Sequence, residues 1–412
     1  MMAEATGDRE IKELLEHYGG DVKKELDNIL GYWMKYCVDE EKGGFYGKID
    51  NGNIADAGAA KGLVLNARIL WTFSAALHEQ ENGDYLAMAG RAYTYIMDHF
   101  YDPQFGGVYW LVDAWGAPLN TKKQVYAIAF CLYGVSEYYA VTQNKAVLET
   151  ALELFRVIEE HSYDTQYGGY FEAFARDWNS LDDLRLSAKD ANEKKTMNTH
   201  LHIIEAYCNL YKVWPDPLLR QKIMALLQVF DSHIINKRTG HLDLFFDEEW
   251  RVRPDVISYG HDIEAAWLLQ ECATIINDGY WVNKMKLHAV TLAEAAAEGL
   301  DGDGGLWYEF EPHEQHLVKE KHWWPQAEAI VGFFNAWQVS GDAKFLHRSY
   351  NNWLFTKRYI IDEEKGEWFW GVNGDRSVMQ GQDKVGFWKC PYHNTRACME
   401  LIKRIGNANK IA

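Results

Sequence analysis

Apolar residues recur along the chain in two patterns that predict two classes of helix. Residues 217–236 carry Leu219, Ile223, Leu226, Leu227 and Phe230 on one stripe, which predicts a helix that buries a single face. Residues 62–80 are apolar nearly all round, which predicts a helix buried on every side. Helices of the first class are expected near 10–37, 85–99, 145–161, 217–236, 280–299 and 342–361, and helices of the second class near 62–80, 121–142, 196–213, 261–278, 324–340 and 392–405.

A glycine turn that leads into a short aromatic strand follows each helix of the first class. The turns are marked by Gly44, Gly107, Gly169, Gly240, Gly305 and Gly366, at spacings of 63, 62, 71, 65 and 61 residues. Copies at a nearly constant period indicate a repeat architecture. Six helix pairs without polar capping repeats favour a closed ring over an open helical solenoid. We therefore expect an all-α fold, one (α/α)6 barrel over residues 1–412, with six inner helices, six outer helices and short β-hairpins in the connecting loops.

The stretch Ser258–Glu264 is rich in polar residues and directly precedes an apolar run. Gly260 breaks the chain just before the helical pattern, so His261 falls in the first turn of the helix. The partial positive charge of a helix N-terminus disfavours imidazolium and keeps the ring neutral. Glu264 lies three residues on, shares the face of His261 and could orient the ring. A surface capping turn, in which Asp262 and Glu264 only complement the helix dipole, is the alternative that this stretch leaves open.

Polar side chains also stand near the start of the other fully apolar helices. They include Arg68, Tyr126, Asn198 with His202, Trp324 with Glu328, and His393, whereas His200 points to a different face from His202. One buried arginine or histidine is more often a satisfied core residue than a functional group. Polar groups at matching positions around a ring instead predict a shared site at one end of the barrel.

The composition restricts the class of partner and the compartment. The net charge is -18 and no basic patch offsets it, which argues against nucleic acid or an anionic membrane as a partner. Met1–Asp8 shows no signal peptide, and no apolar run is long enough to span a bilayer. Six cysteines without a CxxC pair indicate reduced thiols, so we expect a cytoplasmic protein.

The motifs that are missing narrow the chemistry. No HExxH or EF-hand pattern occurs, and no P-loop, GxGxxG fingerprint or nucleophile elbow is present, so we expect no metal and no nucleotide cofactor. The remaining set combines histidines, an arginine, carboxylates and several of the 17 tryptophans. Such a set suits proton transfer on a neutral polyol such as a sugar, with tryptophan faces against C–H surfaces and arginine against a developing oxyanion.

Five sequence blocks carry a resemblance to a known family. Leu65–Trp71, Met197–His202, Ser258–Glu264, His322–Glu328 and Trp388–Asn394 resemble the signature blocks of cellobiose 2-epimerases, a branch of the N-acylglucosamine 2-epimerase family. The similarity runs from about residue 20 to residue 405. Thr395 departs from the pattern, because glycine is expected after the His-Asn pair.

This resemblance implies an (α/α)6 barrel that opens the reducing-end pyranose and moves the C2 proton through a cis-enediolate, without metal or redox cofactor. His393 and His261 would be the acid/base pair, with Glu264 orienting His261, and Arg68 and His202 would bind the C1 and C2 oxygens. The substrate-binding residues would be Tyr126, Asn198, Asp190, Trp324, Trp388 and Glu328. Asp190 belongs to residues 182–195, which we expect to form a loop over the pocket mouth.

Other functions remain open at this stage. A monosaccharide 2-epimerase or aldose–ketose isomerase of the same family would share the barrel and the histidine pair. A glycoside hydrolase would need two carboxylates, for which Glu264 and Glu328 could serve, but would leave the histidines without a role. A sugar-binding protein without turnover would not need an acid/base pair. We expect a disaccharide substrate and a monomer or weak homodimer, while the preferred disaccharide and side isomerisation to the 2-ketose are undetermined.

Overall fold

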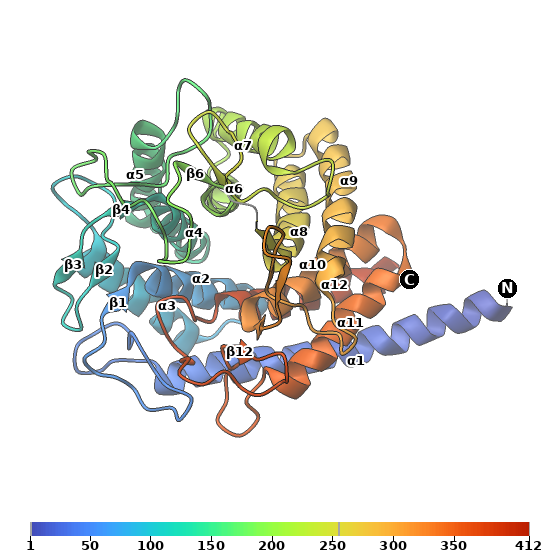
Figure 1. Ribbon diagram of the computed structural model, residues 1–412. Helices are drawn as coiled ribbons and strands as arrows, with labels where there is room; N and C mark the ends of the chain where they lie inside the picture. The colour runs from blue at the N-terminus through green and yellow to red at the C-terminus, as the bar shows by residue number, and fades with distance from the viewer. Residues whose placement is uncertain (1, 254–255, 412) are drawn as a thin grey trace.

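The computed structural model describes residues 2–253 and 256–411, and over these ranges helices of two layers alternate along the chain (Figure 1). The outer layer consists of α1 (Met2–Tyr36), α3 (Gly83–Tyr95), α5 (Lys145–His161), α7 (Pro217–Val229), α9 (Gly279–Ala296) and α11 (Ala343–Tyr359). The inner layer consists of α2 (Leu63–Glu79), α4 (Val125–Thr142), α6 (Met197–Val213), α8 (Tyr259–Ile275), α10 (Trp323–Ser340) and α12 (Tyr392–Ile411).

The inner helices form a closed ring. Each packs against the next along the chain, from α2 through α4, α6, α8 and α10 to α12, and α12 returns to contact α2. The outer helices α3, α5, α7, α9 and α11 pack on α2, α4, α6, α8 and α10 respectively, and α1 packs on α12. The expected (α/α)6 barrel is therefore confirmed, and the open solenoid is excluded.

Burial follows the two hydrophobic patterns. In α4 every residue from Val125 to Ser136 is buried, and in α2 every residue from Leu63 to Ala76 is buried. In α7 the buried residues are Leu219, Ile223, Leu226 and Leu227, the stripe that the sequence predicted. Inner helices are apolar all round because they contact neighbours on both sides and an outer helix behind.

Several helix bounds differ from the expected ones. The helix expected from residue 121 begins at Val125, because Lys123–Gln124 form strand β4. The helices expected over 85–99 and 217–236 each end in a π-helical turn, Ile96–Phe100 and Phe230–Ile234, in which hydrogen bonds span one more residue than in an α-helix. The first helix begins at Met2 rather than near residue 10, and its N-terminal end projects beyond the rest of the molecule (Figure 1).

Short antiparallel strands join neighbouring repeats at the end of the barrel where the inner helices begin. The paired strands are β1 (Lys61–Gly62) with β2 (Leu111–Val112), β4 (Lys123–Gln124) with β5 (Ala173–Phe174), β6 (Lys195–Thr196) with β7 (Phe245–Phe246), β8 (Ile257–Ser258) with β9 (Glu309–Glu311), and β11 (Lys321–His322) with β12 (Gly371–Val372). Strands β3 (Pro118–Asn120) and β10 (His316–Val318) extend two of these sheets. The first strand of each pair leads directly into an inner helix, so the pairing fixes where that helix starts.

A pair of a buried lysine and an aspartate recurs between the strand or loop before an inner helix and the preceding glycine turn. The pairs are Lys61–Asp39, Lys123–Asp102, Lys195–Asp164, Lys321–Asp301 and Lys384–Asp362, with N–O distances of 2.6–2.9 Å. The fourth repeat has Asn236 and Ile257 at the corresponding positions, so both charges are replaced together.

Two further expectations bear on the chain as a whole. No helix within the described residues is long and apolar enough to cross a membrane. All six cysteines lie in the described part of the chain, and each is buried and free of disulfide bonds. The expectation of one domain over residues 1–412 stays a prediction, since Met1 and Ala412 lie outside the described residues.

Candidate active site

A cavity of about 320 Å³ lies at the end of the barrel where the inner helices begin. Its wall contains nearly all of the residues that the sequence singled out: Arg68, Tyr126, Asp190, Asn198, His202, His261, Glu264, Trp324, Trp388 and His393. These residues come from every inner helix and from the loops before them, because the hairpins start the helices at the same level. The predicted shared site is therefore a real cavity in the fold.

His261 lies in the first turn of α8, as the sequence predicted. Its Nδ1 is hydrogen-bonded to Oγ of Ser258, at 2.8 Å, and its ring centre lies 4.7 Å from that of Trp324. A Cβ at position 260 would lie 2.6 Å from Cη2 of Trp324, so Gly260 allows this tryptophan to approach α8. Burial lowers the pKa of His261 to about 3, which makes the ring neutral at physiological pH.

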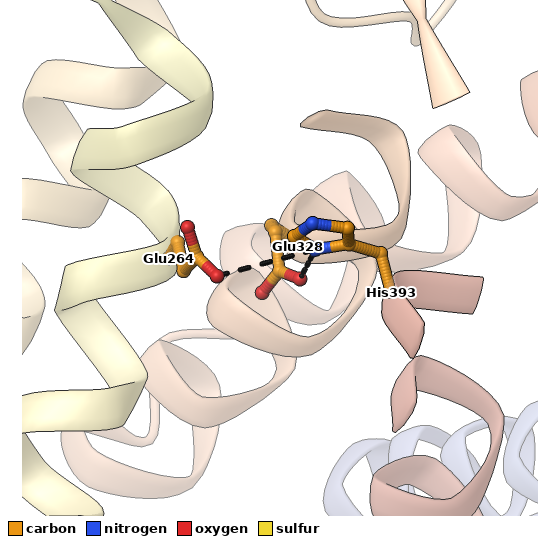
Figure 2. Close-up of side chains that lie close together, drawn as sticks. All are labelled: Glu264, Glu328 and His393. Atoms are coloured by element: carbon orange, nitrogen blue, oxygen red, sulfur yellow. Dashed lines mark hydrogen bonds and ion pairs between the residues drawn. The ribbon is translucent and has the colours of Figure 1, made fainter. Parts of the chain in front are cut away.

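The expected pairing of Glu264 with His261 is not formed. Oε1 of Glu264 accepts a hydrogen bond from Nη2 of Arg396, at 2.7 Å, and lies 4.0 Å from Nδ1 of His393 (Figure 2). Side chains in a helix lean toward its N-terminus. The His261 ring therefore reaches back to Ser258 in β8, and Glu264 reaches the interior of the ring of helices.

His393 lies in the first turn of α12 and is held by Glu328 of α10 (Figure 2). Nδ1 of His393 is 2.7 Å from Oε1 of Glu328, and the other oxygen of Glu328 accepts a hydrogen bond from Nε1 of Trp267, at 2.9 Å. Protein partners thus occupy both oxygens, so Glu328 holds His393 and does not line the cavity, and its expected contact with the substrate stays a prediction. Burial, together with the charges of Arg68 and Arg396, keeps the pKa of His393 well below its usual value.

His202 is held in the same way by a residue that the sequence analysis missed. Nδ1 of His202 lies 2.9 Å from Oε2 of Glu205, one turn further along α6. Burial favours the neutral acid, but Arg396 and His202 outweigh it and lower the pKa of Glu205 to about 2. The carboxylate therefore accepts a hydrogen bond from Nδ1–H, and Nε2 of His202 is left as the acceptor nitrogen. The i, i+3 spacing of these residues was a signal that could have identified the pair.

Arg68 carries a positive charge without a carboxylate partner among the described residues. Its side chain is 3% exposed, donates from Nη2 to the Tyr126 hydroxyl at 2.9 Å, and lies over the Phe130 ring at 4.1 Å. Buried arginines are normally paired with an anion, because removing a charge from water is costly. Arg68 lines the cavity, so a negative charge that develops on a bound molecule could supply the missing partner.

Arg396 of α12 is the second residue that the sequence analysis missed. From Nη2 it donates to Oε1 of Glu264 at 2.7 Å and to Oε1 of Glu328 at 2.6 Å, and from Nη1 it donates to Glu205. Unlike Arg68, it lies in a helix with several other polar and charged residues, so the sequence around it offered no distinct signal.

One group of side chains resembles a metal site in composition. Ligand atoms of Glu264, Glu328 and His393 all lie within 4.8 Å of one another. The guanidinium of Arg396 already bonds the oxygens of both carboxylates, and a divalent cation would meet its positive charge. The arrangement therefore disfavours a bound metal, and the expected metal independence stays a prediction.

Aromatic and amide groups complete the cavity wall. Trp388 lies 5.9 Å from Tyr126 between ring centres, and Oδ1 of Asn198 is buried without a hydrogen-bond partner among the described residues. The loop expected over 182–195 contributes residues 184–187, 189–191 and 193 to the cavity wall, and its Asp190 accepts hydrogen bonds from N and Oγ of Ser187 at 2.8 and 2.9 Å.

His200 and Thr395, which the sequence also singled out, lie outside the cavity wall. His200 points away, as the spacing predicted, and accepts a hydrogen bond at Nε2 from the Tyr170 backbone, at 2.9 Å. At the departure, the buried Thr395 hydroxyl donates a hydrogen bond to the Pro391 carbonyl oxygen, at 2.5 Å, and lies 3.4 Å from the hydroxyl of Thr72.

Comparisons with known proteins agree with this geometry. The profile of the N-acylglucosamine 2-epimerase (GlcNAc 2-epimerase) family matches residues 43–397. A cellobiose 2-epimerase of Bacteroides fragilis is 49% identical over 383 residues, which cover 93% of this chain and 98% of the relative. Among solved structures, a sugar epimerase from a ruminal bacterium has a TM-score of 0.90 at 38% identity and covers 94% of this chain and 99% of its own. The cellobiose 2-epimerase of Spirochaeta thermophila has a TM-score of 0.89 at 36% identity, covering 96% and 98%.

The family match spans most of the chain, and the identity to the Bacteroides fragilis relative extends over nearly its whole length. Helices α2 to α11 and the blocks at the starts of the inner helices lie within the matched region. The chain therefore belongs to the N-acylglucosamine 2-epimerase family.

Proposed function

We propose that this chain inverts C2 of the reducing-end sugar in β-1,4-linked disaccharides, converting cellobiose to glucosyl-mannose and lactose to epilactose. The observation that carries the proposal is a pair of imidazoles, the half-buried His261 and the buried His393, that line one cavity from two different helices. Epimerisation removes a proton from one face of C2 and returns one to the other face, which requires two proton-transfer groups. The identity to the cellobiose 2-epimerase of Bacteroides fragilis supports the substrate class.

The reaction begins with opening of the reducing-end ring to the C1 aldehyde. One imidazole takes the C2 proton through Nε2, the C–H electron pair forms the C1–C2 double bond, and the carbonyl pair moves to O1. The resulting cis-enediolate carries negative charge next to Arg68, the buried cation without a carboxylate partner in the described residues. Preformed positive charge in a buried site lowers the energy of such an intermediate.

The second imidazole then donates a proton to the opposite face of C2. The C1–C2 double-bond pair forms the new C2–H bond, and an electron pair on O1 re-forms the C1 carbonyl. This imidazole must hold a proton when the enediolate forms, and the negative charge beside it opposes the burial that lowers its pKa. The two rings exchange protonation states in each turnover, and proton exchange with water resets them. Glu328 stabilises the imidazolium of His393 through Nδ1.

Glycoside hydrolysis is not favoured by the position of the carboxylates. A hydrolase needs two carboxyl groups on either side of the scissile bond. Glu264 and Glu328 instead share one nitrogen, Nη2 of Arg396, and Glu328 lies behind His393. A monosaccharide epimerase or isomerase of the same family is the remaining alternative, and the assay below separates it from the disaccharide enzyme.

The test is NMR of cellobiose, and then of lactose, with EDTA-treated protein in heavy water. The expected result is the 2-epimer with deuterium at C2. Glucose release would indicate a hydrolase. No change in either disaccharide would contradict the proposed substrate class, and conversion of mannose or N-acetylmannosamine in the same assay would assign the monosaccharide branch. Loss of turnover after EDTA treatment, restored by a divalent cation, would contradict metal independence.

A further inference from the structure

Arg396 links the carboxylates that stand behind two different histidines. The residue is 2% exposed and comes from the second turn of α12. Nη1 donates to Glu205 of α6 and Nη2 donates to Glu328 of α10, at 2.6 Å for the latter. Nη2 also donates to Glu264 of α8, and Nη1 contacts the Tyr392 hydroxyl. One guanidinium thus holds side chains from α6, α8 and α10 together.

Two of these carboxylates also contact an imidazole nitrogen. Glu328 contacts Nδ1 of His393 at 2.7 Å, and Glu205 contacts Nδ1 of His202 at 2.9 Å. An ionised carboxylate only accepts hydrogen bonds, so each imidazole must carry its proton on Nδ1 and leave Nε2 as the acceptor. A protonated carboxyl group can donate instead, and the imidazole would then carry its proton on Nε2.

Without Arg396, Glu205, Glu264 and Glu328 would place several negative charges in one buried region. Mutual repulsion and burial both favour protonation of such carboxyl groups. Burial and the charge of Glu328 already raise the pKa of Glu264 to about 8. A neighbouring cation is therefore needed to keep the carboxylates behind the imidazoles ionised.

We propose that Arg396 is a positioning residue that fixes His393 and His202 as their Nδ1–H tautomers by keeping Glu328 and Glu205 ionised. In this state Nε2 of His393 can accept the C2 proton, and Nε2 of His202 can accept a hydrogen bond from a sugar hydroxyl. The catalytic part of this inference rests on the proposed epimerase function. The tautomer part concerns the resting protein and does not depend on any substrate.

A second cavity makes the role of Arg396 accessible to experiment. It has a volume of about 360 Å³ and is lined by Arg396 and Glu205 together with residues near the ends of the inner helices, including His78 and Lys403. The side chains of His78 and Lys403 are 52% and 55% exposed, so the cavity opens to the surface at the far end of the barrel. A small cation can therefore reach the position of the guanidinium without passing through the sugar cavity.

The first measurement is the tautomer of His202 and His393 in the wild-type protein, read from ¹⁵N chemical shifts and assigned with single histidine variants. Both rings are expected to be protonated at Nδ1. Protonation of either ring at Nε2 would overturn the proposal, and this result needs neither an Arg396 variant nor a substrate.

The second measurement compares Arg396→Met with Arg404→Met as a matched control. Arg404 lies on the same helix and bonds Glu400 at 3.0 Å, outside the cavity wall. Arg396→Met is expected to lower kcat for C2 epimerisation by about 100-fold, in the range of a lost general base, with a much smaller change in KM. The Nδ1–H signals should disappear, while Arg404→Met should leave kcat and both tautomers unchanged.

Chemical rescue separates positioning from a merely structural role. Millimolar guanidinium is expected to raise the activity of Arg396→Ala at least tenfold over that of the same variant without guanidinium, and to restore the Nδ1–H tautomers. Arg396→Met that keeps both tautomers, or keeps kcat within threefold of wild type, would overturn the proposal. If neither truncation folds, Arg396→Lys supplies the test, because one ammonium cannot reproduce the fork. Wild-type kcat together with an unchanged pH profile in that variant would contradict the proposal.

Discussion

Each of three histidines in this site is anchored through one ring nitrogen. His202, His261 and His393 are each held at Nδ1, by Glu205, Ser258 and Glu328 respectively, at 2.7–2.9 Å. Anchoring one nitrogen fixes the ring plane and leaves the other nitrogen for chemistry in the cavity. The anchors also differ in kind, because a carboxylate enforces one tautomer, whereas the hydroxyl of Ser258 can donate or accept. His261 is therefore free to change tautomer, and His393 is not.

The two histidines should separate in an exchange experiment. We expect His261→Asn and His393→Asn each to lose epimerisation by at least about 100-fold, because each removes one proton-transfer group. The remaining imidazole still faces one side of C2. One variant should therefore exchange deuterium into cellobiose but not into glucosyl-mannose, and the other should show the reverse, as measured by NMR in heavy water. Exchange of both sugars by both variants would contradict the two-base arrangement.

Arg68 should act mainly on the intermediate. Arg68→Met is expected to lower kcat by roughly 100-fold, because removing one stabilising donor for an oxyanion has effects of this size. Arg68→Lys should recover part of the loss, since it keeps the charge without the planar fork. Steady-state kinetics would measure both variants. A rise in KM with unchanged kcat would show that Arg68 binds the substrate and the transition state equally, and would contradict this role.

At the scale of elements, the repeat explains which parts of the turns are interchangeable. Within the described chain, Lys195 and Asp164 form the buried pair of the third repeat, where both side chains are at most 4% exposed. In the fourth repeat, Asn236 and Ile257 occupy the same positions of the hairpin, so this repeat has no charged pair there. The turn therefore folds with either a charged pair or a neutral pair, but a single charge would be left uncompensated.

This comparison predicts a compensation between two substitutions. Lys195→Ile should destabilise the protein by about 3–5 kcal/mol, because it leaves Asp164 buried without its partner. The double variant Asp164→Asn with Lys195→Ile reproduces the fourth repeat and should recover more than half of that loss. Urea unfolding at fixed pH measures both. Equal stability of the single and double variants would show that the pair is not coupled.

At the scale of the whole molecule, the interior of the barrel holds titratable groups whose shifts have opposite signs. Burial lowers the pKa of His200 to about 4 and raises that of Glu172 to about 8. A lowered histidine pKa contributes stability above the unfolded value near 6.5, and this stability is lost as the pH falls toward 4. A raised glutamate pKa contributes stability below about 4.5 that is lost as the pH rises through 8.

Two substitutions should therefore change stability with opposite pH dependence. His200→Gln copies the fifth repeat, where Gln326 accepts a hydrogen bond from the Leu306 backbone at 2.7 Å, as His200 does from Tyr170. Relative to this variant, the wild type should lose up to about 1.4 kcal/mol for each pH unit between roughly 6.5 and 4. Relative to Glu172→Gln, it should lose stability between pH 4.5 and 8. Parallel slopes in denaturant titrations would contradict both assignments.

The sequence by itself determined the barrel and the level of the site. Periodicity separates fully buried helices from one-sided ones, and the spacing of the glycine turns counts the repeats. It also separated two histidines that are two residues apart in the chain but lie on different faces of the helix. His202 lines the cavity, whereas His200 accepts a hydrogen bond from the Tyr170 backbone. These are local properties, because the period of a helix fixes which residues share a face.

The tertiary structure alone decided which groups touch across the barrel. Glu264 bonds Arg396, which is 132 residues away, and not His261 on its own helix; His393 bonds Glu328, 65 residues away. Arg396 was missed because its carboxylate partners lie on three other inner helices, whereas the pairing of Glu205 with His202 lies within one helix. Helical spacing fixes the face on which a side chain lies, but the rotation and depth of neighbouring helices, set by packing, determine which charges meet at the centre of the ring.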